Sequence, residues 1–301
     1  MSTLTALSDA VSHVAGVVAP SIVSIGRSGR GSGIVVADGQ VLTNAHNLRG
    51  EEVTVTFSDG RSTRGSVAGI DPDGDLAVIA VDTSGSSAID WPDGTTTLGL
   101  GAAVFGAAAT VGGSLRITFG LVSAVARAFR GPGGRRIAGS VEHTAPLAPG
   151  SSGGALVDAE GRFVGLNTNR IGEGFYLALP ADAALKSRVQ ALARGDAPQR
   201  RVLGVAIAPA HVARRLRRSV GLADRAGVLV RGVEDGSLAA AAGVEAGDLI
   251  VSAGARPIAD SDDLFEALWE LDPPFELGLV RGADERSVTV GAPDGRTPGD
   301  A

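Results

Sequence analysis

Cysteine is absent from the 301-residue sequence, which excludes disulfide bonds, zinc sites built on thiolates and cysteine nucleophiles. Basic residues are not in excess, since 27 Lys and Arg face 33 Asp and Glu. The chain therefore lacks the cationic surface of a nucleic-acid-binding protein, and we expect no nucleic-acid partner. No stretch approaches the ~20 consecutive apolar residues of a membrane-spanning helix, so no membrane span is expected.

The first 20 residues are amphipathic, with apolar residues at helical spacing from Leu4 to Val17. They lack the positively charged start of a secretory signal peptide, and Asp9 and His13 interrupt the apolar residues. As written, the sequence predicts a cytoplasmic protein. If the N-terminus has been trimmed, the prediction becomes an extracytoplasmic protein.

Short stretches rich in Val, Ile and Leu, which we interpret as strands with a side-chain period of two, dominate the first 180 residues. Residues 22–25, 32–36 and 40–44 are examples, and Gly or Asp residues separate them. A period of two with frequent turn residues is typical of antiparallel strands, and 44 glycines suit many tight turns. The pattern predicts a β-barrel or β-sandwich.

The segment Ala148–Leu156 consists mostly of small residues and has neither helical nor strand periodicity. Its glycines allow a sharp turn and a close approach to another molecule. Such a turn would present the hydroxyl of Ser152 as a nucleophile. Gly150, Ser151 and Ser152 would form an oxyanion hole, with the amides of Gly150 and Ser152 as donors. The alternative is a glycine-rich turn without a catalytic role.

A histidine and an aspartate precede Ser152 in equally distinctive positions. His46 follows a predicted strand that ends at Asn44, and Asp75 follows a turn at 71–74. Each alone has a structural alternative, as a half-buried histidine and as a turn residue. Together, the order His, Asp, Ser on an all-β chain is that of a chymotrypsin-type triad. We therefore expect His46 as general base, Asp75 as its partner and Ser152 as nucleophile.

At these residues the chain resembles the HtrA/Deg serine proteases, whose trypsin-like domain is followed by PDZ domains. The resemblance extends from about residue 20 to about residue 290, and the matching segments are Gly31–Ile34, Leu42–His46, Asp71–Val78, Phe119–Ser123, Gly150–Leu156 and Gly161–Thr168. It implies a mainly β chain, with a trypsin-like double β-barrel protease domain followed by a small α+β PDZ domain. It also implies the same triad roles, with no metal and no cofactor.

Three positions depart from the family pattern. Ser151 and Ala148 stand where the family usually has Asn, and Thr144 stands where an Asp is common. The triad is intact, and the departures concern the loop around the serine. A protease that is latent at rest is therefore one alternative.

The specificity pocket is expected to involve Pro146, Leu147 and Asn167. In trypsin-like proteases the pocket floor lies six residues before the serine, which is Pro146 here, and Asn167 begins a segment that helps form the pocket in the family. No carboxylate stands at the floor to attract Lys or Arg. We therefore expect cleavage after small or medium apolar residues such as Val, Ala or Leu.

Composition divides the chain into five segments. They are an N-terminal amphipathic segment at 1–20, the protease domain at 21–194, a linker at 195–199, the PDZ domain at 200–293 and a flexible tail at 294–301.

The second domain resembles the family's PDZ domain, which binds C-terminal peptides by adding a strand to a sheet edge. Leu203, Gly204 and Val205 match the carboxylate-binding loop. A helix over 262–271, capped by Ser261, would supply Leu264 and Leu268 to the side-chain pocket. The alternative is that these two leucines belong only to the core. We expect both leucines to be peptide-binding residues.

The resemblance implies an ATP-independent serine endopeptidase that cleaves unfolded or misfolded proteins. Its PDZ domain would bind C-terminal peptides, and regulation of activity through that domain is left open. The competing hypothesis is a latent or inactive protease-like scaffold or chaperone that binds peptides through its PDZ domain. A homotrimer is also open, because the family's trimers use the N-terminal segment, which is short and lacks aromatic residues here.

Overall fold

The computed structural model describes residues 2–93, 98–130, 136–172, 174–196 and 202–291. These residues form two compact units, which divide after residue 198. The predicted linker at 195–199 lies mostly outside the described residues. The predicted tail at 294–301 lies entirely outside them.

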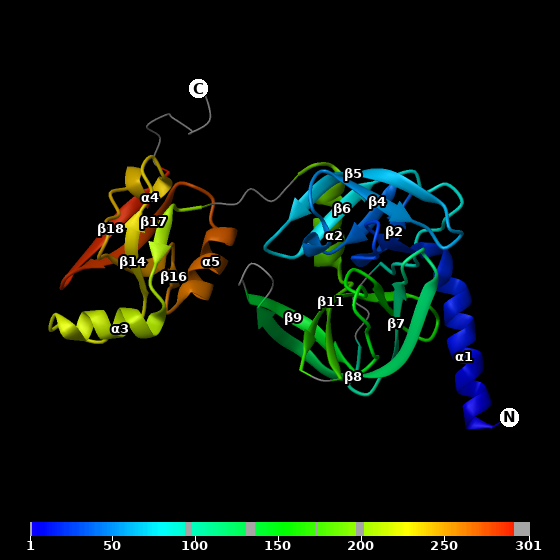
Figure 1. The fold of residues 1–301 in the computed structure, drawn as a ribbon. Helices are drawn as coiled ribbons and strands as arrows, with labels where there is room; N and C mark the ends of the chain where they lie inside the picture. The colour runs from blue at the N-terminus through cyan, green and yellow to red at the C-terminus, as the bar shows by residue number, and fades with distance from the viewer. Residues whose placement is uncertain (1, 94–97, 131–135, 173, 197–201, 292–301) are drawn as a thin grey trace. The chain divides into compact units, whose positions relative to one another are not determined.

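Six short strands near the start of the first unit close into an antiparallel barrel (Figure 1). Alternate positions such as Val23, Ile25 and Val41 point inward and are fully buried around Phe57. The predicted period of two is thereby confirmed. In barrel order the strands are β1 (Ile22–Ile25), β2 (Gly31–Ala37), β3 (Gln40–Thr43), β6 (Leu76–Ala80), β5 (Ser62–Asp71) and β4 (Glu52–Thr56).

A second antiparallel barrel follows in the same unit, and its core is built around Val104, Leu156 and Val164. A larger apolar cluster joins the two barrels, with Leu42 and Leu76 from the first and Phe105 and Leu166 from the second. The predicted double β-barrel is therefore confirmed. In barrel order the strands are β10 (Ala155–Val157), β11 (Phe163–Ile171), β12 (Phe175–Pro180), β9 (Arg136–His143), β8 (Leu115–Arg130) and β7 (Ala103–Ala109).

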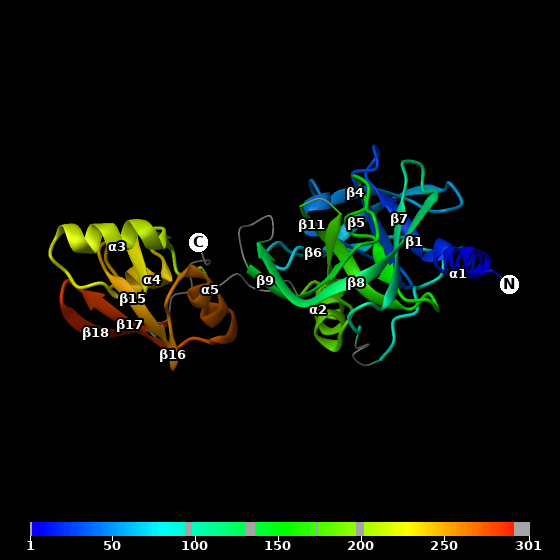
Figure 2. The ribbon, with the colours of Figure 1, turned by 90° about the horizontal axis from the view of Figure 1, so that it is seen from below.

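Two helices cover the barrels. Helix α1 (Thr3–Val18) is capped by Ser2 and contacts β7 and β8 along one side of the unit (Figures 1 and 2). Helix α2 (Ala183–Ala193) is capped by Asp182 and packs on β5 and β6. Both helices bury their apolar face in the cluster between the barrels, so the N-terminal amphipathic segment is part of the first unit.

The second unit is a sheet with helices packed against it. Its core includes Val228, Ile250 and Leu277. The strands run in the order β13 (Val205–Ile207), β14 (Val228–Val233), β15 (Leu249–Ala253), β17 (Phe275–Arg281) and β18 (Asp284–Val290), and β16 (Arg256–Pro257) pairs with β15. The helices are α3 (Ala210–Ser219), α4 (Leu238–Ala241) and α5 (Ser261–Glu270).

The predicted cap of α5 is corrected by one residue. Asp260, not Ser261, is the N-cap, and its carboxylate accepts hydrogen bonds from the amides of Asp262 and Asp263. The Asp260 amide in turn donates to the Asp263 carboxylate, which completes a capping box. Within the described residues, no helix is both long and apolar enough to cross a membrane.

Candidate active site

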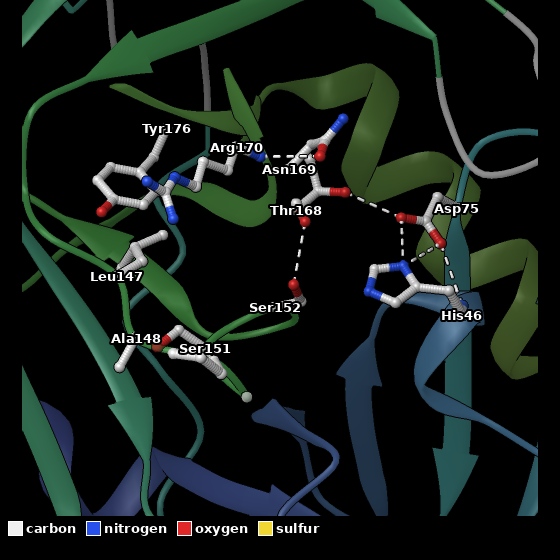
Figure 3. Close-up of a pocket in the computed structure, with 12 residues that line it drawn as sticks. His46, Asp75, Leu147, Ala148, Ser151, Ser152, Thr168, Asn169, Arg170 and Tyr176 are labelled. Atoms are coloured by element: carbon white, nitrogen blue, oxygen red, sulfur yellow. Dashed lines mark hydrogen bonds and ion pairs between the residues drawn. The ribbon is translucent and has the colours of Figure 1, made fainter. Parts of the chain in front are cut away.

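His46 and Asp75 form a direct contact on the first barrel. His46 lies in a 3₁₀ turn (Ala45–Asn47) that follows β3, and Asp75 lies just before β6. The ring Nδ1 of His46 is 2.9 Å from each carboxylate oxygen of Asp75, and the His46 amide donates to Oδ1 at 3.1 Å. The Asp75 carboxylate therefore fixes the ring so that its other nitrogen, Nε2, is directed toward the cavity (Figure 3).

Asp75 has an unusual backbone conformation, with φ at 55°. A non-glycine residue in this left-handed region costs about 1 kcal/mol or more, and such strain gathers at functional sites. The buried amide of Asn44 donates to the Asp75 carbonyl at 2.9 Å and so holds the strained residue in place.

Thr168 connects Asp75 to Ser152. The pairing of β11 with β12 shifts between Asn167 and Asn169, so Thr168 lies in a bulge outside the regular ladder. Its hydroxyl donates to Asp75 Oδ2 at 2.9 Å, and its carbonyl accepts a hydrogen bond from Ser152 Oγ at 3.0 Å. Thr168 belongs to a segment that resembles the family in sequence, but the sequence alone predicts no role for it in the site.

The hydroxyl of Ser152 is turned toward Thr168 (Figure 3). Within the described residues its recorded hydrogen bond goes to the Thr168 carbonyl rather than to His46. Ser152 is half-buried and lines the same cavity as His46 and Asp75. A change of χ1 rotamer is therefore the movement that would release the hydroxyl for reaction.

The turn that carries Ser152 has a distinct pattern of amides. The amide of Ser151 donates to Ala148 and that of Gly154 donates to Ser151, which holds the turn. Among the described residues, the amides of Gly150 and Ser152 donate to no protein acceptor. Gly150 adopts φ of 86°, a conformation that favours glycine. The two free donors on this turn are available to an oxygen that carries developing negative charge.

Residues of the first barrel hold this turn of the second barrel. Ser32 donates through its hydroxyl to the Gly150 carbonyl at 2.9 Å and through its amide to the Ser152 carbonyl at 2.8 Å. Asn47, next to His46, donates to the same Ser152 carbonyl at 2.9 Å. The site is therefore assembled across the two barrels.

A cavity of about 520 Å³ opens beside Ser152. On the side away from His46 its wall is formed by Leu147, Tyr176 and Arg170 (Figure 3). Of the three predicted pocket residues, Leu147 lines this cavity and the exposed Pro146 does not. The segment that begins at Asn167 was expected to help form the pocket, but neither Arg170 nor Tyr176 was singled out, because their positions depend on the pairing of β11 with β12.

Asn167, the third predicted pocket residue, is fully buried behind this wall. Its side chain donates to the Ala155 carbonyl at 2.8 Å and accepts from Nε2 of His143 at 3.0 Å. The His143 ring stacks on Tyr176 with 5.9 Å between centroids. Burial lowers the pKa of His143 to about 4, so the ring is neutral and supports the pocket wall from behind.

The predicted peptide-binding residues lie together in the second unit. Leu203, Leu264 and Leu268 are buried in one apolar cluster, and Val205 packs against it. Gly204 lies between Leu203 and β13, with φ of 75°. β13 pairs with β14 alone among the described strands. The three leucines are core residues, and their use in a peptide groove stays a prediction.

Comparisons with known proteins agree with this architecture. The trypsin-like peptidase domain model matches residues 31–166, and the PDZ domain model matches residues 202–291. Among solved structures, the HtrA-type protease AlgW with a decapeptide has a TM-score of 0.75 at 24% identity, covering 93% of this chain and 97% of that one. The serine endoprotease from Yersinia pestis has a TM-score of 0.71 at 24% identity, covering 93% and 96%. These two likenesses concern the fold.

Proteins similar in sequence identify the family. The serine protease HhoA of Synechocystis sp. is 33% identical over 288 residues, which are 90% of this chain and 72% of that protein. A periplasmic DegP-like serine endoprotease of Halomonas elongata is 30% identical over 273 residues, covering 88% of this chain and 56% of that protein. This chain thus spans little more than half of the DegP-like relative. The chain belongs to the HtrA-type serine endopeptidases, which join a chymotrypsin-like peptidase domain to a PDZ domain.

Proposed function

We propose that this protein cleaves unfolded or misfolded proteins without ATP, a metal or a cofactor, through His46, Asp75 and Ser152. The observation that carries the proposal is the continuous set of hydrogen bonds from His46 through Asp75 and Thr168 to Ser152. Ser152 itself lies on a turn with two free amide donors, those of Gly150 and Ser152. A serine hydroxyl is a weak nucleophile at neutral pH, and an oriented base is what activates it.

The reaction begins when the Ser152 hydroxyl leaves the Thr168 carbonyl and turns to His46. Nε2 takes the hydroxyl proton as Oγ attacks the carbonyl carbon of the scissile bond. Asp75 holds the ring and stabilises its cationic form, while the amides of Gly150 and Ser152 stabilise the oxyanion.

Collapse of the tetrahedral intermediate breaks the C–N bond, and the imidazolium of His46 donates its proton to the leaving amine. Water then enters, gives a proton to His46 and attacks the acyl-enzyme ester. The ester bond to Ser152 breaks, and the proton returns from His46 to its hydroxyl.

The PDZ domain is proposed to bind the C-terminal peptide of a substrate or regulator at the free edge of β13. Leu203, Gly204 and Val205 would receive the carboxylate, since such domains hold it with backbone amides. A regulatory signal from this unit to the protease unit is part of the proposal. The homotrimer stays a prediction, and the periplasmic name of the DegP-like relative supports an extracytoplasmic setting.

The first test is digestion of unfolded casein by the full-length protein, with Ser152→Ala as the inactive variant and Ser114→Ala as a control. Ser114 is exposed and lies outside the cavity. Cleavage by the parent and by Ser114→Ala, but not by Ser152→Ala, is expected. Labelling of Ser152 with an uncharged fluorophosphonate gives an independent measure of nucleophilicity.

The latent and scaffold alternatives predict different results. A latent protease would cut casein only after C-terminal peptides are added. A scaffold would bind those peptides but neither cut casein nor react with the fluorophosphonate under any condition.

A further inference from the structure

Arg170 is a charged residue of the substrate cavity that the reaction does not use. It lies on β11, two residues after Thr168, and lines the same cavity as Ser152. In Figure 3 its side chain extends toward the Tyr176 ring, on the side of Ser152 away from His46. A role for Arg170 in the choice of substrate rests on the proposed function.

The guanidinium of Arg170 is held at one end and free at the other. Its Nε donates to the Gly172 carbonyl at 2.7 Å, which fixes the side chain's direction. Among the described residues, no carboxylate lies within ion-pair distance of it, and its two Nη groups donate no recorded hydrogen bond. A guanidinium carries five donors in a planar fork that matches a carboxylate.

No other residue of the cavity wall neutralises this charge. Asp75 also lines the cavity, but its carboxylate is almost fully buried and receives hydrogen bonds from His46 and Thr168. The remaining lining residues on Arg170's side, Leu147 and Tyr176, are uncharged. The cavity therefore offers a substrate an apolar wall that ends in one cation.

The direction of the reaction decides which substrate residue meets this cation. His46 must donate a proton to the leaving amine, so the amine side of the scissile bond lies next to His46. The side chain on the acyl side, called P1, then lies on the opposite side of Ser152. That side holds Leu147, Tyr176 and Arg170 (Figure 3).

We infer that Arg170 selects an acidic P1 residue, with glutamate preferred. The methylenes of glutamate would pack against Leu147 and Tyr176, and its carboxylate would accept hydrogen bonds from the free Nη groups of Arg170. The sequence-based expectation of a small apolar P1 residue considered the pocket floor at Pro146 and did not include Arg170.

The test compares peptides that differ only at P1, built around a cleavage site mapped in casein. With the parent, kcat/KM for P1 Glu should exceed that for Gln about tenfold, as expected for one charge-assisted hydrogen bond. In Arg170→Gln, the kcat/KM values for the Glu and Gln peptides should differ by no more than about twofold. Arg170→Lys should keep part of the preference, and Arg170→Glu should turn it toward a Lys peptide.

Arg64→Gln is the matched control, because Arg64 is an exposed arginine of the same unit and lies outside the cavity. Arg64→Gln should leave the ratio of kcat/KM for the Glu peptide to kcat/KM for the Gln peptide unchanged. Raised ionic strength should reduce the ratio in the parent, since salt screens exposed charges. Equal rates for Glu and Gln, or a preference that survives Arg170→Gln, would overturn the inference.

A binding measurement separates this inference from the proposed function. Ser152→Ala should bind a fluorescent P1 Glu peptide more tightly than its Gln counterpart, and Ser152→Ala with Arg170→Gln should not. If the parent neither cuts peptides nor reacts with the fluorophosphonate, the proposed function fails. If it does both without a preference for Glu, only the role of Arg170 fails.

Discussion

The hydroxyl of Ser32 donates to the carbonyl of Gly150 across the junction of the two barrels, at 2.9 Å. The Ser32 Oγ also accepts a hydrogen bond from the Ala109 amide at 3.0 Å, so the hydroxyl is held on both sides. Its position on β2 connects the turn that carries Ser152 to a strand of the other barrel. The orientation of the free amides at Gly150 and Ser152 thus depends on a residue that lies 118 positions before Gly150 in the sequence.

We predict that Ser32→Ala lowers kcat about tenfold with a small change in KM. The variant leaves the Gly150 carbonyl and the Ala109 amide without a partner, and it loosens the turn that carries the oxyanion donors. Stability should fall by about 1–3 kcal/mol for the same reason. Steady-state kinetics with a peptide substrate and urea unfolding measure the two effects.

Ser24→Ala is the control for this prediction. Ser24 is buried on β1 and pairs with Ser32 in the strand register, yet it makes no recorded contact with the turn among the described residues. Its kcat should stay near that of the parent. A similar loss of kcat in both variants would mean that any change in this part of the barrel is harmful.

Thr168→Val is expected to lower kcat about 10- to 100-fold while the fold is kept. Valine has nearly the shape of threonine, but it removes the hydroxyl that donates to the Asp75 carboxylate. Hydrogen bonds to charged groups contribute about 1.5–3 kcal/mol. Thr168→Ser keeps the donor and should restore most of the activity, whereas a Ser variant as slow as the Val variant would assign the effect to packing.

His143 makes stability depend on pH. Its folded pKa of about 4 lies below the ordinary value of 6.5, because burial disfavours the charged ring. Above pH 6.5 the ring is neutral in both the folded and the unfolded state, so it does not change the free energy of unfolding with pH. As the pH falls from 6.5 to 4, the unfolded chain takes up the proton first, and stability should decrease by about 3 kcal/mol.

Urea unfolding from pH 7.5 to pH 4 measures this dependence. His143→Gln should be less stable at neutral pH and should have a flatter profile. His13→Gln is the control, because His13 is exposed on α1. A parent profile that His143→Gln leaves unchanged would rule out this histidine as the cause.

Gly69→Ala should destabilise the protease unit by about 1–3 kcal/mol, as overpacking does. A Cβ on Gly69 would lie 2.3 Å from the carbonyl oxygen of Leu192, so helix α2 would have to move off β5. Thermal unfolding should therefore begin several degrees lower. Gly99→Ala, with no heavy atom within 4 Å of the new Cβ, should change the melting temperature little.

The sequence predicted the barrels and the family because those depend on local patterns. The β-branched stretch at 22–25 and the glycine-rich turn around Ser152 can both be recognised from neighbouring residues. The cap of α5 was misplaced by one residue because Asp260 and Ser261 are both good caps, and only the backbone conformation distinguishes them.

The residues of the pocket wall could not be predicted from local sequence patterns. Tyr176 and Arg170 pair with each other in the register of β11 and β12, and the shift at Thr168 decides where the Arg170 side chain goes. A bulge depends on tertiary contacts rather than on residue preference. The roles of His46, Asp75 and Ser152 remain predictions that the variants above will test.

The division of the site between the barrels also determines when activity can arise during synthesis. His46 and Asp75 belong to the first barrel, whereas Ser152 and Thr168 belong to the second. With the roles proposed above, a growing chain that has folded its first barrel holds the base and its carboxylate but not the nucleophile. Neither barrel alone could damage its neighbours on the ribosome, and proteolysis becomes available only when the whole peptidase unit is complete.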